Sequence, residues 1–119
     1  MSRTPEEVFE ELSAAFGSGD LEEASEAYSD DCIQIWNGHT KRGRSGVREG
    51  LADFVSDLGE MQAYEEPVKL FEDNVLYLEW WADLGDRRCV GVDTLVFQDG
   101  QITVHTIKYD FKELGNEPR

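Results

Sequence analysis

One segment in the last third of the sequence predicts a β-hairpin, and the register of that hairpin constrains the rest of the fold. The segment runs from Val92 to Phe111, VDTLVFQDGQITVHTIKYDF. Apolar and polar residues alternate on both sides of Asp99 and Gly100, and an Asp-Gly pair between two such runs is a strong hairpin signal. Two loop types fit the pair, and they give each strand residue a different partner.

The first option is a two-residue type I′ loop. In that loop Gln98 pairs with Gln101, so counting back along the strands places Asp93 opposite Thr106. His105 then lies on the other face of the sheet, because successive side chains of a strand point to opposite faces. The carboxylate and the imidazole are separated in this register.

The second option is a turn in which Gly100 takes the left-handed conformation as a bulge. Phe97 then pairs with Gln101, and Asp93 lies directly across from His105. The two side chains share a face and form a candidate acid–base pair.

The bulged register also sorts the hairpin into two faces. One is expected to be a pocket wall: Cys89, Gly91, Asp93, Leu95, Phe97, Thr103, His105, Ile107, Tyr109 and Phe111. The other is rich in β-branched residues: Val90, Val92, Thr94, Val96, Ile102, Val104 and Thr106. A flat β-branched face packs well against a second sheet, which predicts a homodimer formed through the sheet.

The order of the other elements predicts an α+β domain. Helices are expected in TPEEVFEELSAAFGSG, where Thr4, Pro5 and Glu7 form a capping box, in the short DLEEASEAY, which ends with Tyr28, and in RSGVREGLADFVSDLG. Short strands are expected in CIQIW and HTKRG, and long ones in AYEEPVKLFE, with Pro67 at an edge or bulge, and VLYLEWWADL. The sheet is therefore mostly antiparallel, with the helices on one face.

Length and charge limit the classes of function. A chain of 119 residues is expected to form one domain, residues 1–119. Its net charge of -15 repels phosphate backbones and anionic lipids, so neither nucleic acid nor a membrane is an expected partner. The sequence begins with no apolar leader and has no stretch long enough to cross a bilayer, which predicts a cytoplasmic protein.

Metal and cofactor signals are missing from the sequence. Cys32 and Cys89 are isolated, so buried free thiols are expected rather than a disulfide. The two histidines do not cluster with cysteines or carboxylates at ligand spacing, and no glycine-rich loop follows a strand. We therefore expect neither a metal site nor a cofactor.

Three motifs together resemble the nuclear transport factor 2-like superfamily, in particular its SnoaL-like and steroid delta-isomerase-like branches. They are GDLEEASEAYSDD, RGRSGVREGL and VDTLVFQDGQI with the later IKY. The resemblance implies a cystatin-like cone, in which a strongly curved, mostly antiparallel sheet wraps around N-terminal helices and leaves a pocket at one end. It also implies a homodimer packed through the sheets, and it favours the bulged register.

The resemblance places Asp93 where steroid delta-isomerases have a protonated carboxylic acid that donates to the developing enolate oxygen, a well-known case of a carboxylic acid kept neutral by apolar surroundings. Two positions depart from that pattern. Leu12 lies about where that enzyme has its tyrosine donor, and Trp36 about where it has its carboxylate base. Steroid isomerisation by that mechanism is therefore not expected.

Asp93 and His105 are the candidate catalytic residues. An ionised Asp93 would orient the His105 ring, which would act as general base or acid, with Tyr109 as a further hydrogen-bond donor. The alternative is a buried polar pair that only satisfies its own hydrogen bonds. Residues expected to line the substrate pocket, or otherwise to belong to the core, are Tyr28, Trp36, Trp80, Leu95 and Tyr109.

The sequence thus predicts a protein with a pocket for a small apolar organic molecule, resembling SnoaL-like cyclases and isomerases. If it is an enzyme, a cofactor-free isomerase, cyclase or lyase-like activity through acid–base chemistry is expected. Two alternatives remain: a ligand-binding protein without catalysis, and a homodimerisation module whose interior is filled.

Overall fold

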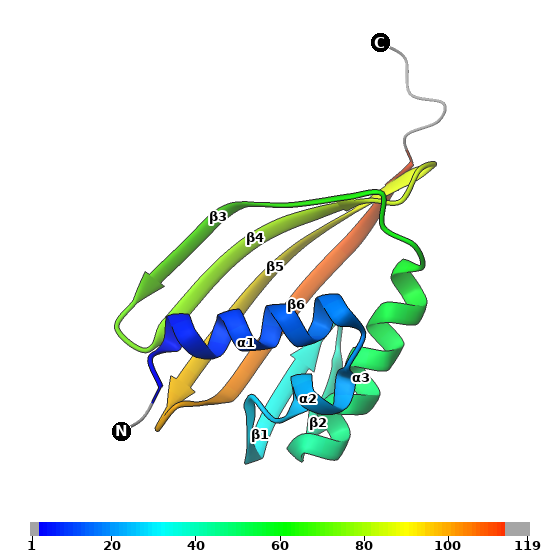
Figure 1. Ribbon diagram of the computed structural model, residues 1–119. Helices are drawn as coiled ribbons and strands as arrows, with labels where there is room; N and C mark the ends of the chain where they lie inside the picture. The colour runs from blue at the N-terminus through cyan, green and yellow to red at the C-terminus, as the bar shows by residue number, and fades with distance from the viewer. Residues whose placement is uncertain (1–2, 114–119) are drawn as a thin grey trace.

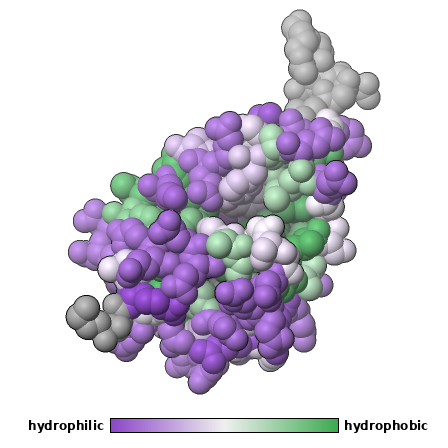
Figure 2. Space-filling model, viewed as in Figure 1, coloured by the Kyte–Doolittle hydropathy of each residue, from purple (hydrophilic) through white to green (hydrophobic). Residues whose placement is uncertain are grey.

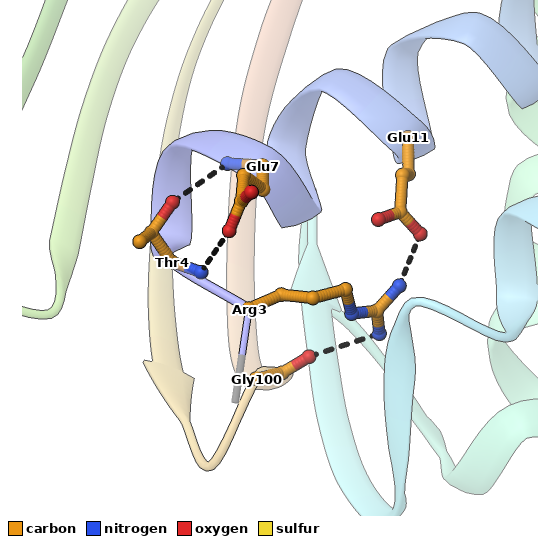
Figure 3. Close-up of polar contacts among 5 residues, drawn as sticks. All are labelled: Arg3, Thr4, Glu7, Glu11 and Gly100. Atoms are coloured by element: carbon orange, nitrogen blue, oxygen red, sulfur yellow. Dashed lines mark hydrogen bonds and ion pairs between the residues drawn. The ribbon is translucent and has the colours of Figure 1, made fainter. Parts of the chain in front are cut away.

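Helix α1 (Pro5–Ser18) begins at the predicted capping box in the computed structural model, which describes residues 3–113. The Thr4 hydroxyl accepts a hydrogen bond from the Glu7 backbone N–H at 3.1 Å, and the Glu7 carboxylate accepts one from the Thr4 backbone N–H at 2.8 Å (Figure 3). Two of the N–H groups that a helix start leaves unpaired are thereby satisfied.

Arg3 ties the start of α1 to the tip of the closing hairpin. Its guanidinium pairs with the Glu11 carboxylate and donates to the Gly100 carbonyl oxygen at 3.1 Å (Figure 3). The first helix and the last hairpin are therefore fixed to each other at one end of the molecule.

Helix α2 (Leu21–Ser25) is shorter than predicted. Asp20 caps it by accepting from the Glu23 backbone N–H at 2.9 Å. Tyr28, which was predicted as the end of this helix, is instead the first residue of strand β1 (Tyr28–Trp36). It pairs there with Ile102, a residue distant in sequence, and this pairing overrides the local helical pattern.

Strand β2 (His39–Arg42) follows β1 through a tight turn and leads into the longest helix, α3 (Gly43–Leu58). The turn residues Asn37 and Gly38 both have positive φ, 45° and 87°, as the Asn-Gly pair predicts. Helix α3 ends at Gly59 and packs against β1.

Four long strands complete the sheet: β3 (Ala63–Glu72), β4 (Val75–Asp83), β5 (Arg87–Gln98) and β6 (Gln101–Glu113). The order across the sheet is β2-β1-β6-β5-β4-β3, and every neighbouring pair is antiparallel except β1 with β6. The sheet is curved and open, and α1 and α3 lie on its concave side (Figure 1). This is the predicted α+β cone.

The predicted bulge at Gly100 is wrong. Gln98 pairs with Gln101, and Asp99 and Gly100 form the two-residue loop with φ values of 53° and 77°. These are the left-handed conformations that a type I′ loop requires at both positions, and Asp-Gly supplies them at low cost.

A bulge lies instead at Thr103, three residues after Gly100. Phe97 pairs with Ile102 and Val96 pairs with Val104, so that Thr103 is the extra residue on β6. Its hydroxyl donates to the Val96 carbonyl oxygen at 3.3 Å, which stabilises the irregularity.

The bulge at Thr103 changes the partners of the candidate pair but keeps the two side chains together. Asp93 pairs with Ile107, and His105 pairs with Leu95. The prediction that Asp93 lies directly across from His105 is therefore wrong, because the two residues are diagonal neighbours on one face. Diagonal neighbours are close enough for long side chains to touch.

The predicted faces need two further corrections. Ile102 is fully buried on the inner face rather than outward, because it precedes the bulge and pairs with Phe97. Phe111, predicted in the pocket wall, is 38% exposed near the end of β6. On β4 every second residue is buried, namely Leu76, Leu78, Trp80 and Ala82.

Both cysteines are buried free thiols, as predicted. Burial raises the pKa of Cys32, and it raises the pKa of Cys89 to about 11. The reactive thiolate is therefore a minor form of both residues at neutral pH. Between residues 3 and 113 no helix has the length and apolar character that a membrane crossing needs.

Candidate functional site

Four side chains from four strands form one chain of hydrogen bonds on the concave face of the sheet. Trp80 on β4 donates its indole N–H to Asp93 Oδ1 on β5 at 2.8 Å. Asp93 Oδ2 lies 2.8 Å from His105 Nε2 on β6, and His105 Nδ1 lies 2.7 Å from the Tyr28 hydroxyl on β1. Acid, imidazole and phenol are thus linked in series.

Burial makes this chain electrostatically strong. Tyr28 is fully buried, and the other three residues are at most 8% exposed. Hydrogen bonds and charges act with little screening in such surroundings. The same burial, together with the nearby Asp93 carboxylate, raises the pKa of Tyr28 above its ordinary range, so the phenol keeps its proton.

One protonation pattern satisfies every group in the chain. A Tyr28 phenol donates to His105 Nδ1, so the proton of a neutral ring lies on Nε2 and points at Asp93. The Asp93 carboxylate then accepts from His105 on one oxygen and from Trp80 on the other. Tyr28 therefore sets the tautomer of His105 through the nitrogen farther from Asp93.

This pattern predicts that Tyr28→Phe destabilises the protein by about 1–3 kcal/mol, because it leaves a buried ring nitrogen without its partner. Urea unfolding measures the loss, and ¹⁵N shifts of the His105 ring report whether the Nε2–H tautomer persists. The matched control is Tyr77→Phe, which removes an exposed hydroxyl bonded to Glu79 at 2.6 Å and is expected to cost below about 0.5 kcal/mol. Equal losses in the two variants would contradict the role of Tyr28.

The chain forms part of the wall of a cavity of about 230 Å³ between the helices and the sheet. Its mouth includes the exposed residues Ser13, Gly17, Met61 and Tyr64. Most of the remaining wall is apolar: Phe9, Leu12, Phe16, Leu51, Phe54, Leu58, Leu78 and Ile107. An apolar cavity with a few convergent polar groups is the usual form of a small-molecule site.

Four of the seven site residues predicted from the sequence line this cavity, namely Tyr28, Trp80, Asp93 and His105. The other three, Trp36, Leu95 and Tyr109, lie elsewhere in the core. The Tyr109 hydroxyl donates to the Asp57 carboxylate on α3 at 2.8 Å, and its ring stacks on Trp36 with centroids 6.1 Å apart. Tyr109 thus holds α3 to the sheet rather than donating into the cavity.

Three polar residues of the cavity wall were missed by the sequence analysis, Ser13 on α1 and both Tyr64 and Glu66 on β3. The Tyr64 hydroxyl donates to Glu66 Oε2 at 2.6 Å. The signal was Pro67, which predicts an edge strand or a bulge: the β3–β4 register shifts between Glu65 and Val68, around that proline. A shift of register changes which side chains point inward. Pro67 therefore predicts where the strand is irregular, but it does not predict that Glu66 points into the cavity.

Fold and site together define a class: an α+β cone whose curved sheet carries a buried polar chain at the wall of an apolar cavity. The family described as "SnoaL-like domain" matches residues 9–105. The chain belongs to this SnoaL-like domain family, and the predicted resemblance is confirmed.

Solved structures with the same fold support the assignment. One is an NTF-2 like protein of unknown function from Burkholderia xenovorans, with 21% identity and TM-score 0.71 over 96% of this chain and 87% of that one. Another is a putative ketosteroid isomerase from Kribbella flavida, with 15% identity and TM-score 0.73 over 97% and 83%.

A third structure is a de novo designed protein with a curved β-sheet, with 18% identity and TM-score 0.76 over 92% of this chain and 88% of that one. At these identities the likeness shows the fold alone. A comparison with curated protein sequences gave no match.

Proposed function

We propose that the protein is a cofactor-free enzyme of the isomerase-like or cyclase-like kind that performs acid–base chemistry on a small apolar organic molecule held in the cavity. The observation that carries this proposal is the buried chain from Trp80 through Asp93 and His105 to Tyr28, which forms part of the cavity wall. A carboxylate held by two donors beside an apolar cavity is pre-organised for proton transfer.

Asp93 rather than His105 is proposed as the group that exchanges a proton with the ligand. Both ring nitrogens of His105 are occupied, one by Asp93 and the other by Tyr28. The Asp93 side chain keeps 12% of its surface exposed, against 6% for His105, and each of its oxygens has a second lone pair. His105 is then a positioning residue, which reverses the roles that the sequence suggests.

In the proposed reaction Asp93 takes a proton from an acidic C–H of the ligand and returns it to another atom of the same molecule. The N–H groups of Trp80 and His105 hold the two carboxylate oxygens in place in both steps. The putative ketosteroid isomerase among the structural neighbours has a name consistent with this class of reaction, and it shares the fold with this chain.

The experiment uses 5-nitrobenzisoxazole, whose ring opens when a base removes one C–H proton and the N–O bond breaks. The probe needs only a base in an apolar site and gives a coloured phenolate. We expect the wild type to turn over the probe and the Asp93→Asn variant to lose this activity. Turnover at the rate of free carboxylate in solution would overturn the proposal.

A ligand-binding function without catalysis is the second candidate, and one observation favours it. Every polar group in the chain satisfies its neighbour, so the four residues form a complete network before any ligand is present. A protein of this kind gives no turnover of the probe, whereas a small apolar ligand still raises its melting temperature.

We also propose a homodimer formed through the convex face of the sheet. Two large apolar residues on the strands that flank β6 are exposed on that side, Ile35 on β1 (42%) and Val92 on β5 (38%). Paired sheets bury such surface from both protomers through the same patch.

The dimer predicts that sedimentation gives twice the 13.5 kDa mass of one chain, and that Val92→Glu gives the single mass. A two-fold interface uses the same patch on both protomers, so the variant would bury one unpaired carboxylate from each of them. Ser56→Glu adds the same charge on the exposed side of α3 and is expected to leave the dimer intact. A monomeric wild type would contradict the interface.

A further inference from the structure

Two carboxylates line the cavity, and no lysine or arginine of residues 3–113 does. Asp93 lies within the wall, and only 8% of its surface is exposed. Glu66 lies near the mouth, with 21% of its side chain exposed. The cavity belongs to a chain of net charge -15, so its field favours positive and neutral molecules over anions.

The bulge of β3 brings Glu66 to the cavity. Glu65 pairs with Trp81 and Val68 pairs with Glu79, so two residues of β3, Glu66 and Pro67, lie against one residue of β4. A bulge of this kind re-aims a side chain that regular alternation would place elsewhere. Glu65, one residue earlier, remains exposed and outside the cavity wall.

Aromatic rings line the cavity between these two carboxylates. Trp80 packs edge-on against Phe54 with centroids 5.6 Å apart and lies 6.1 Å from the Tyr64 ring. Phe16 lies 5.9 Å from Phe54. Aromatic faces attract cations, most strongly where water is excluded. Figure 2 shows white and green residues near the centre of the face that carries α1, surrounded by purple ones.

The rim of the cavity already holds one cation by the same two kinds of contact. Lys69 Nζ lies 5.5 Å from the centroid of the Phe9 ring and 3.8 Å from Glu66 Oε1. The Lys69 side chain is 45% exposed, so water screens this pair and its contribution is small. Lys69 therefore competes only weakly with a cation that binds inside.

The other basic residues near the helices lie outside the cavity wall. Lys41, Arg42, Arg44 and Arg48 form a basic run in the sequence, and none of the four lines the cavity. Three of them pair with carboxylates away from the cavity wall: Lys41 with Glu49, Arg44 with Asp30, and Arg48 with Glu22. The negative field of the cavity is therefore not offset by this run.

From these observations we propose that the cavity binds a small organic cation, an apolar molecule with an ammonium or quaternary ammonium group, and that Glu66 selects its charge. This names the ligand class of the proposed function and rests on the cavity being its ligand site. The volume of about 230 Å³ lies below the roughly 300–1,000 Å³ typical of drug-sized ligands, which favours a small molecule.

The test compares choline with 3,3-dimethylbutan-1-ol, which has the same shape with carbon in place of the charged nitrogen. Isothermal titration of the full chain is expected to show choline binding about tenfold more tightly or better, because only the cation gains from the carboxylates and the rings. The choline affinity is expected to fall as salt is added, and the alcohol affinity to stay constant.

Two variants are expected to change choline binding in opposite directions, and a third serves as the control. Glu66→Gln is expected to weaken choline binding by about tenfold and to leave the alcohol unchanged. Glu65→Gln removes an equal charge outside the wall and is expected to alter neither by more than about twofold. Lys69→Met removes the competing cation and is expected to strengthen choline binding only.

Three results would overturn the proposal: choline binding no more tightly than the alcohol, choline not binding at all, or Glu65→Gln weakening choline as much as Glu66→Gln. Turnover of 5-nitrobenzisoxazole, measured in the same preparation, tests the proposed acid–base function separately from the proposed ligand class. A protein that turns over the probe without preferring choline keeps its acid–base role and loses only the ligand class.

Discussion

Replacement of Asp93 by Asn is expected to lower kcat/KM for 5-nitrobenzisoxazole by about 100-fold or more, the usual contribution of a positioned general base. Asn keeps the size of Asp93 but carries no charge and accepts protons poorly. Its oxygen still has a donor in Trp80, while its NH₂ group faces His105 Nε2, which carries the ring proton in the wild type. The substitution therefore removes the base and also disturbs the His105 tautomer.

The control for this experiment is Asp110→Asn, on β6. Asp110 is exposed and lies outside the cavity wall, so removal of its charge is expected to leave kcat/KM within about twofold. Circular dichroism at the assay temperature establishes that the Asp93 variant is folded. A folded Asp93→Asn protein with wild-type turnover would assign the reaction to another group.

The second large effect is expected for Gly91→Ala, which is predicted to destabilise the protein by about 3 kcal/mol or more. Gly91 pairs directly with Trp80, and a Cβ atom at Gly91 would lie 2.2 Å from the indole atoms Cε2 and Cζ2. Overpacking alone costs about 1–3 kcal/mol. Displacement of the indole also breaks its bond to Asp93, worth about 1.5–3 kcal/mol for a charged acceptor.

Thermal unfolding measures this effect as a fall in Tm of about 10 °C or more for a domain of this size. Gly17→Ala is the matched control, because a Cβ atom at Gly17 meets nothing within 4 Å and the residue lies within α1. It is expected to raise the stability by up to about 1 kcal/mol, since alanine favours helix. A Gly91→Ala protein that melts within 2 °C of the wild type, on the order of 0.5 kcal/mol, would show that the indole moves freely.

Local signals in the sequence predicted the parts of the fold that local physics determines. The capping box of Thr4 and Glu7 satisfies N–H groups within one turn, so it is visible in four consecutive residues. The end of α2 was placed too late, because Tyr28 leaves the helix to pair with Ile102. Ile102 is too far along the chain for the residues near Tyr28 to predict this pairing.

The closing hairpin shows the same limit within the candidate site. Gly100 is a visible place for a bulge, whereas a bulge at Thr103 depends on how β5 and β6 bend together. Either bulge inserts one extra residue, so both keep Asp93 and His105 on one face even though the predicted pairing was wrong. Pro67 predicted an edge or a bulge in β3, but the direction in which Glu66 points depends on the pairing with β4.

The parallel pairing of β1 with β6 has a consequence for the order in which the site forms during synthesis. Tyr28 and His105 are 77 residues apart in sequence, and their hydrogen bond joins an early strand to the last one. The helices and the β3–β4 hairpin rely on near neighbours and can form while the chain is still being made. Non-local strand pairing is slower. The hydrogen-bonded chain of Trp80, Asp93, His105 and Tyr28 is therefore complete only once β6 has paired with β1, after the local elements have formed.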